Sequence, residues 1–129
     1  MPLIEFVNWS TRPSELQENL RELSDPISTL AKSLRDAAVS ADVPGLTKDT
    51  VTVTIGGRRV LSGDRTLIIK VSMLFDRPDR TKEVRDRLAQ KLGEAAMKWV
   101  APTWRVEVMI ERFDPAVNSF FTTGPLEEA

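Results

Sequence analysis

Two kinds of hydrophobic pattern alternate along the chain. Short runs in which apolar or β-branched residues dominate, several with a period of two, predict strands, and these fall at 2–8, 50–55, 66–75 and 104–112. Between the first two runs, and again between the last two, apolar residues recur every three or four positions, which predicts an amphipathic helix. The element order is therefore strand, helix, strand, and then the same again.

The first helical stripe contains a proline. Its apolar positions are Leu16, Leu20, Leu23, Ile27, Leu30 and Leu34. Pro26 removes a backbone hydrogen bond inside this stripe, and Ser24 or Asp25 is placed to cap a helix that starts after it. Because the stripe keeps its phase across Pro26, we expect one kinked helix or two nearly collinear helices that end near Val39.

The second helical stripe is uninterrupted, and its apolar positions are Val84, Leu88, Leu92, Ala95 and Trp99. Asp79 or Thr81 is expected to cap its start, and the helix is expected to end before Ala101-Pro102. The strand before it carries Leu67-Ile68-Ile69, which is apolar on both faces. Such a run predicts a central strand that is covered on both sides.

Length indicates a single domain over residues 1–129. We divide it into strand–helix–strand units at 2–56 and 65–112, followed by a tail at 113–129. Gly56-Gly57 predicts a turn or a short hairpin between the units. Two arrangements fit this order: a ferredoxin-like antiparallel sheet, and two parallel βαβ units placed side by side. The hydrophobic pattern does not choose between them.

The amino-acid composition excludes several kinds of catalytic and metal-binding site. The chain has no cysteine and no histidine, which excludes disulfides, thiolate ligands, a Ser-His-Asp triad and a His-ligated metal. We expect neither a metal nor another cofactor. The net charge of −1 provides no basic field for nucleic acid or acidic membranes. No apolar run approaches the ~20 residues of a membrane span, and no signal-like segment is present, so we expect a cytoplasmic protein.

Pro2 follows the initiator Met1 and begins the first strand. A small second residue is the context in which the initiator is normally removed, and removal would leave proline with a free secondary amine. An α-amino group titrates near ~8, and burial or nearby cations lower its pKa further. Such an amine is a candidate general base or nucleophile at neutral pH. Alternatively, Pro2 only starts an edge strand, where its missing N–H costs nothing.

A proline at position two that opens a strand, followed by two βαβ units in about this length, resembles the tautomerase superfamily. The chain is similar to 5-carboxymethyl-2-hydroxymuconate isomerase and to proteins like macrophage migration inhibitory factor, most strongly at 1–4, 65–78 and 106–118. The resemblance implies an α/β (α+β) fold, with a four-stranded sheet and two helices on one face. It also implies a homotrimer, with each pocket built around the proline near a subunit interface.

The activity that this resemblance implies is a tautomerase or isomerase that needs no cofactor. Pro2 would move a proton on a small unsaturated 2-hydroxy or 2-oxo acid. Where isomerase members carry arginines before the second strand, this chain has Lys48-Asp49-Thr50. On the fourth strand, Glu107 and Met109 replace a tyrosine and an asparagine of the inhibitory-factor group. Since hydratase-type members use a pocket carboxylate to position water, Glu107 is the second candidate catalytic residue.

Two alternatives to the isomerase therefore stay open: a hydratase, dehalogenase or decarboxylase that uses Pro2 with Glu107, and a non-catalytic trimeric binding module that keeps Met1. A carboxylate substrate needs cations, and a guanidinium binds it bidentately. Arg65 lies where decarboxylase members have a substrate arginine. Further candidates for substrate contacts are Arg58 and Arg59 at a pocket rim, and Trp104, Met109 and Phe113 on a pocket wall. Each has a plain alternative role as a surface, core or interface residue.

Overall fold

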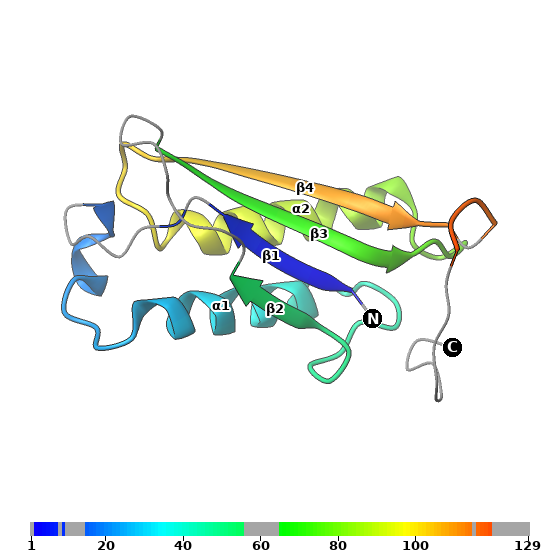
Figure 1. Ribbon diagram of the computed structural model, residues 1–129, viewed down its shortest axis with the longest axis horizontal. Helices are drawn as coiled ribbons and strands as arrows, with labels where there is room; N and C mark the ends of the chain where they lie inside the picture. The colour runs from blue at the N-terminus through cyan, green and yellow to red at the C-terminus, as the bar shows by residue number, and fades with distance from the viewer. Residues whose placement is uncertain (1, 8, 10–14, 56–64, 115, 120–129) are drawn as a thin grey trace.

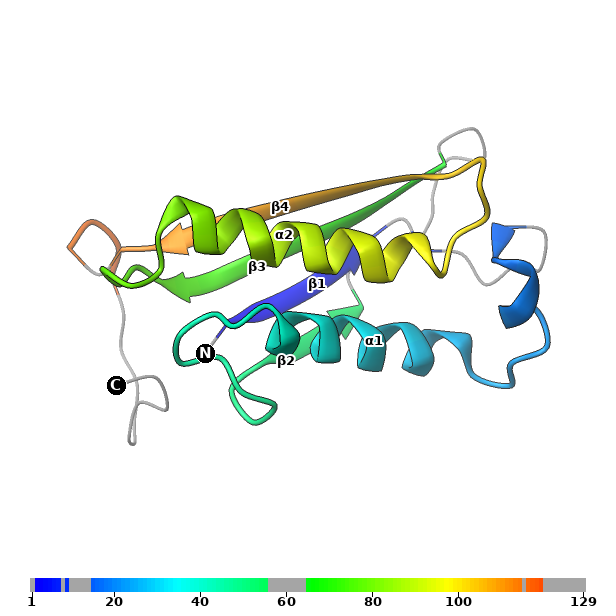
Figure 2. The ribbon, with the colours of Figure 1, turned by 180° about the vertical axis from the view of Figure 1, so that it is seen from behind.

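The computed structural model describes residues 2–7, 9, 15–55, 65–114 and 116–119, and over these ranges a four-stranded sheet carries two α-helices (Figure 1). The strands are β1 (Leu3–Val7), β2 (Thr52–Ile55), β3 (Thr66–Phe75) and β4 (Arg105–Phe113). The helices are α1 (Pro26–Ser40) and α2 (Lys82–Met97), which lie side by side on one face of the sheet (Figure 2). This confirms the expected α+β class with both helices on the same face.

The strand order is β2-β1-β3-β4. β1 is parallel to β2, β3 is parallel to β4, and the two halves meet where β1 pairs antiparallel with β3. The structure therefore has two parallel βαβ units side by side, and the ferredoxin-like alternative is wrong. Because the units run in opposite directions, right-handed crossovers place both helices on the same face.

This topology changes the interpretation of Pro2. β1 is a central strand, so the interpretation of Pro2 as the start of an edge strand is wrong. Pro2 stands just before β1, and its carbonyl accepts a hydrogen bond of 3.2 Å from the N–H of Thr52. A proline is tolerated at this position because the first residue of a strand can dispense with its own N–H.

The hydrophobic core lies between the sheet and the two helices. Its fully buried side chains include Ile4, Phe6, Leu30, Leu34, Leu67, Ile69, Val71, Leu88 and Leu92. β3 is a central strand, as its apolar run predicts, but the helices cover only one of its faces. On the other face Ile68 is half-buried. The expected two-sided cover is therefore wrong for the described part of a single chain.

α1 begins later than the leucine stripe predicts. Asp25 is its N-cap, and the Oδ1 atom of Asp25 accepts a hydrogen bond of 3.2 Å from the N–H of Ser28. The hydrogen bond that the Ser28 hydroxyl donates to Asp25, and then this backbone contact, lower the pKa of the Asp25 carboxyl below its ordinary value of 3.8. Pro26 follows at the first helical position, where a missing N–H costs no helical bond. Asp25 was one of the two expected caps.

The described residues between 15 and 25 form no α-helix, so the expectation of a kinked or double helix is wrong. Leu16 makes an isolated antiparallel bridge with Val100, and a 3-10 turn follows at Glu18–Leu20. The N–H of Gln17 donates to the carbonyl of Trp99 at 2.9 Å, in a segment that follows α2. An α-helix through these residues would give up this long-range pairing, which a local pattern cannot reveal.

The second helix follows the sequence prediction closely. Thr81 is the N-cap, since its Oγ1 accepts a hydrogen bond of 3.3 Å from the N–H of Val84, and the helix ends before Ala101. The expected turn at Gly56-Gly57 and most of the tail at 113–129 lie outside the described residues. Within the described ranges, neither helix has the length and hydropathy to cross a bilayer.

Candidate functional site

Pro2 lies at the end of the sheet where β1 begins and where β3 and β4 finish (Figure 1). We call this the proline end. Pro2 is buried. The antiparallel pairing of β1 with β3 ends with Leu3 opposite Ser72, so Pro2 and Met73 are the next residues along the two chain segments. The residues that directly follow β3 and β4 are therefore the ones brought toward Pro2.

Cationic side chains are concentrated at the proline end. Arg77 and Arg80 follow β3, Arg112 lies near the end of β4, and Lys48 lies in the segment before β2. The Arg77 guanidinium bonds Asp79 at 2.9 Å, and Arg112 lies 3.6 Å from Asp76. Both pairs are partly exposed, so solvent screens them and leaves the guanidinium groups available to an anion. This end of the sheet can therefore accept a carboxylate.

Arg80 is different, because its side chain is buried and 1% exposed. Its Nε and Nη2 atoms donate to the carbonyl of Pro44 at 2.9 and 2.7 Å, and its Nη1 donates to the carbonyl of Phe75 at 2.9 Å. Pro44 belongs to the segment between α1 and β2, and Phe75 is the last residue of β3. Arg80 therefore fastens that segment to the end of β3.

Gly45 lets the two guanidinium groups come together. Its φ is 81°, and a Cβ atom there would lie 2.5 Å from Nη1 of Arg77 and 2.8 Å from Nη2 of Arg80. Only glycine fits this combination of backbone and space without displacement. The buried Thr50 hydroxyl donates to the Gly45 carbonyl at 3.3 Å. Two residues later, the N–H of Thr52 donates to the carbonyl of Pro2. The segment thus connects Arg77 with the start of β1.

The proline end also has apolar surface. The rings of Phe75 and Phe113 stack with centroids 5.0 Å apart and an interplanar angle of 23°. A shallow hollow of about 290 Å³ beside them is lined by Asp76, Arg77 and Pro78. Of the residues expected to contact substrate, Phe113 is the one that the described part of a single chain brings to this end.

Arg65 and Trp104 lie at the opposite end of the sheet. The N–H of Arg105, the first residue of β4, donates to the carbonyl of Arg65 at 2.8 Å, just before β3 begins. Arg65 is eight positions from Met73, or roughly 26 Å along the strand. Trp104 is buried in the core and only 7% exposed. Arg58 and Arg59 lie outside the described residues.

Glu107 and Met109 are exposed on the sheet face that the helices leave open. Glu107 stands opposite Ile68 and accepts a hydrogen bond of 3.2 Å from Arg105, while Met109 stands opposite Lys70. These register positions are roughly 16 and 10 Å along β3 from the position of Met73. Within one chain, the structure therefore does not bring Glu107 to Pro2.

The structure places Met73, Arg77 and Arg80 at the proline end, and none of them was among the site residues expected from the sequence. One signal for Arg77 was present, because it lies in the stretch of strongest resemblance. This signal could be used only once β1 is known to run antiparallel to β3. The strand direction decides which end of β3 lies next to Pro2, and therefore that Arg77 lies there.

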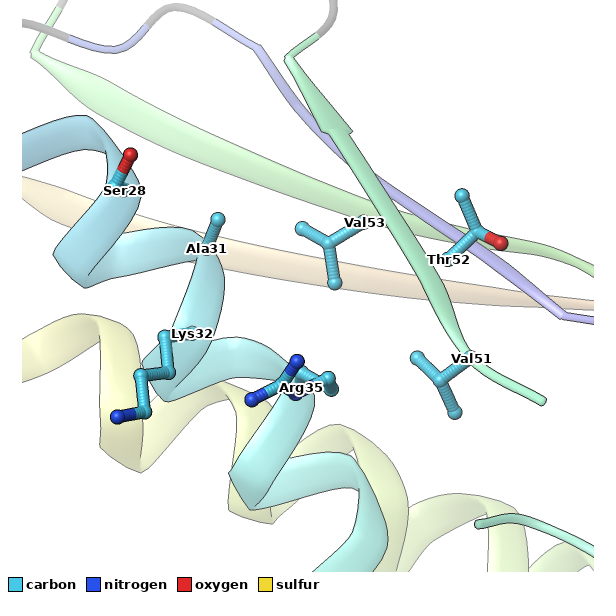
Figure 3. Close-up of a pocket in the computed structure, with 7 residues that line it drawn as sticks. All are labelled: Ser28, Ala31, Lys32, Arg35, Val51, Thr52 and Val53. Atoms are coloured by element: carbon cyan, nitrogen blue, oxygen red, sulfur yellow. The ribbon is translucent and has the colours of Figure 1, made fainter. Parts of the chain in front are cut away.

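A groove of about 470 Å³ lies between α1 and the edge strand β2 (Figure 3). Val51 and Val53 extend from the strand toward the helix, and Lys32 and Arg35 supply positive charge from α1 (Figure 3). The other lining residues are Ser28, Ala31 and Thr52. The groove lies between β2 and α1, whereas Pro2 is hydrogen-bonded to β2 from the side of its neighbouring strand β1.

In the described ranges, no cluster of three acidic side chains is arranged to hold a metal ion.

No protein-family model and no curated protein sequence matches the chain. Solved structures do share its fold. A fused 4-OT described as an asymmetric trimer has a TM-score of 0.60 and 18% identity, over 95% of this chain and 92% of that one. Pt0534 inactivated by 2-oxo-3-pentynoate has a TM-score of 0.59 and 16% identity, over 92% and 89%.

A third solved structure is FG41 malonate semialdehyde decarboxylase inhibited by 3-bromopropiolate, with a TM-score of 0.57 and 18% identity, over 95% of this chain and 91% of that one. These structures are from the tautomerase superfamily. The tautomerase-like fold that the resemblance implied is therefore confirmed, and at these identities the similarity concerns the fold.

Proposed function

We propose that the chain is an enzyme in which the amine of Pro2, freed by removal of Met1, moves a proton on a small unsaturated 2-hydroxy or 2-oxo acid. The observation that carries this proposal is the position of Pro2. It is buried at the start of a central strand, at the sheet end where Arg77 is held beside Gly45. A base and a carboxylate-binding group are the two parts that such an isomerase needs.

The reaction is a proton transfer from one atom of the substrate to another. The unprotonated Pro2 amine takes a proton from the enol hydroxyl or from the α-carbon, and returns it at the conjugated position. Burial and nearby guanidinium groups favour the neutral amine at physiological pH. Arg77 binds the substrate carboxylate and stabilises the negative charge that develops. Because the amine regains its starting state in each cycle, the transfer itself consumes no co-reactant.

The fold supports this substrate class. Two solved structures that share the fold are described with 2-oxo-3-pentynoate and 3-bromopropiolate. Both compounds are short acids in which a carbon–carbon triple bond is conjugated to a carbonyl group. Hydration, dehalogenation or decarboxylation by Pro2 with Glu107 is the alternative, and it requires Glu107 from another chain.

We also propose a homotrimer. A fused 4-OT with this fold is described as a trimer. Among the described strands, none pairs with the outer edges of β2 and β4, and Leu3 and Ile68 are half-buried on the open face. A closed ring would cover such edges and bring residues of a second chain to each proline end. Light scattering at micromolar concentration checks this, and a stable monomer would contradict it.

Two mass measurements test the proposed function. The intact mass first shows whether Met1 is absent. Incubation with 2-oxo-3-pentynoate should then add one molecule per chain, since a nucleophilic amine adds to a conjugated alkyne, and peptide mapping should place the adduct on Pro2. The control is the same protein with Met1 proven intact, which should not react at this position. A retained Met1 in the native protein, or an adduct only on lysines, would overturn the proposal and favour the binding module.

The two candidate carboxylate-binding arginines give separable results. Arg77→Ala should raise KM and lower kcat/KM by about 10- to 150-fold, because a charged hydrogen bond contributes about 1.5–3 kcal/mol. A similar loss in Arg65→Ala, measured by the same steady-state assay, would place Arg65 of a neighbouring chain in the pocket. Unchanged kinetics in Arg77→Ala would remove Arg77 from the site.

A further inference from the structure

Met73 has an unusual backbone conformation within β3. Its φ is 59°, in the left-handed region that disfavours side chains larger than glycine. The other described non-glycine residue with positive φ is Asp42, which follows the end of α1. Helices often end in this conformation, and aspartate adopts it more readily than most residues. Neither explanation applies to a methionine inside a strand.

The strain at Met73 belongs to a β-bulge. Val71 pairs with Ile110 and Leu74 pairs with Arg112, so three steps on β3 match two on β4. The burial pattern shifts with it: Leu74 is 1% exposed and takes the core position, whereas Met73 is 42% exposed. In an unbulged strand, Met73 would follow Ile69 and Val71 into the core. The bulge therefore takes a large apolar side chain out of the core.

The bulge lies next to Pro2. The antiparallel pairing of β1 with β3 ends with Leu3 opposite Ser72, so Pro2 and Met73 are the next residues along the two chain segments. Arg77 lies four residues further along the same chain segment. Bulges next to functional sites commonly redirect a side chain. Here the redirected side chain is apolar, and its residue lies between the β1 pairing and Arg77 along the chain.

We propose that Met73 is a specificity-determining residue, whose side chain forms the apolar wall against which the unsaturated carbon chain of the substrate lies. The strained backbone is kept because it presents this side chain beside Pro2 instead of burying it. An unbranched, polarisable thioether suits contact with a flat conjugated chain. This inference rests on the proposed function and adds the residue that recognises the carbon chain.

Three substitutions separate the role of the side chain from that of the backbone. Met73→Ala and Met73→Gly both remove the wall, so both should lower kcat/KM for the unsaturated acid by at least roughly tenfold, mainly through KM. Met73→Leu keeps an apolar side chain and should stay within a few-fold of the wild type. Met73→Gly should melt at a higher temperature than Met73→Ala, because glycine adopts positive φ without strain. Met97→Ala, at the exposed end of α2, is the matched control and should change neither quantity.

The order of measurement keeps the two proposals distinct. The wild-type chain is tested first for labelling of Pro2 and for turnover, and a chain that shows neither overturns both proposals. With an active wild type, unchanged kcat/KM in both Met73→Ala and Met73→Gly overturns the role of Met73 alone. A melting temperature of Met73→Gly at or below that of Met73→Ala overturns the strained-backbone part.

Discussion

Replacing Pro2 with alanine should lower turnover by about 100- to 10,000-fold, the usual contribution of a positioned general base. Alanine at this position still carries an α-amine after removal of Met1, but a primary amine on a freely rotating residue differs in basicity and in position. The fold should survive, because Pro2 precedes β1 and contributes a backbone carbonyl to Thr52 that alanine also provides. Steady-state kinetics and circular dichroism measure the two effects.

The pH profile provides an independent check of the same amine. The base acts in its neutral form, so the rate should rise with pH as the amine loses its proton, and this limb reports the amine pKa. Burial and nearby guanidinium groups disfavour the protonated form, so that pKa should lie below the value of an ordinary exposed secondary amine. Full activity in Pro2→Ala, or in a protein with Met1 proven intact, would contradict the proline mechanism.

The elements of the fold could be predicted because each depends on a local pattern. The alternation in β2 and β4 and the stripe of α2 place these elements within two residues or so of their observed bounds. The structure of the segment before α1 could not be predicted in this way, although the spacing of its leucines fits a helix. Its structure depends on Leu16 pairing with Val100, which lies far away in the sequence.

The site was predictable only in part, for a similar reason. The chemistry proposed for Pro2 follows from its place in the sequence. Its partners depend on strand direction: Arg65 and Arg77 flank the same strand, and only the antiparallel pairing of β1 with β3 shows that Arg77 shares the end with Pro2. Met73 also lies in the stretch of resemblance at 65–78, but its bulge gave no signal, because a bulge in a sequence is most readily suggested by a glycine within a strand, and there is none here. Phe113 was expected on a pocket wall, and it is the last residue of β4, which is parallel to β3 and therefore ends at the same end of the sheet.

Replacing Arg80 with methionine should lower the free energy of unfolding by about 2–6 kcal/mol, because two partly buried carbonyls lose the Arg80 donor and the loss of such a hydrogen bond costs about 1–3 kcal/mol each. Methionine is long and apolar, so the loss reports mainly the carbonyls of Pro44 and Phe75 and not a large cavity. Against a typical total of about 5–15 kcal/mol, this is a large share. Urea unfolding measures it directly.

Two further variants show whether the guanidinium geometry matters. Arg80→Lys keeps the charge but cannot donate two forked bonds to Pro44 and a third to Phe75, so its stability should fall between those of wild type and Arg80→Met. Arg77→Ala removes a partly exposed partner of Asp79 and should lower the free energy of unfolding by at most about 1 kcal/mol.

Since Arg80 fastens the segment before β2, the loss of Arg80 should also speed amide hydrogen exchange at Thr50. An Arg80→Met protein within about 0.5 kcal/mol of the wild type, the range of an ordinary surface change, would show that Arg80 does not hold this end of the sheet together.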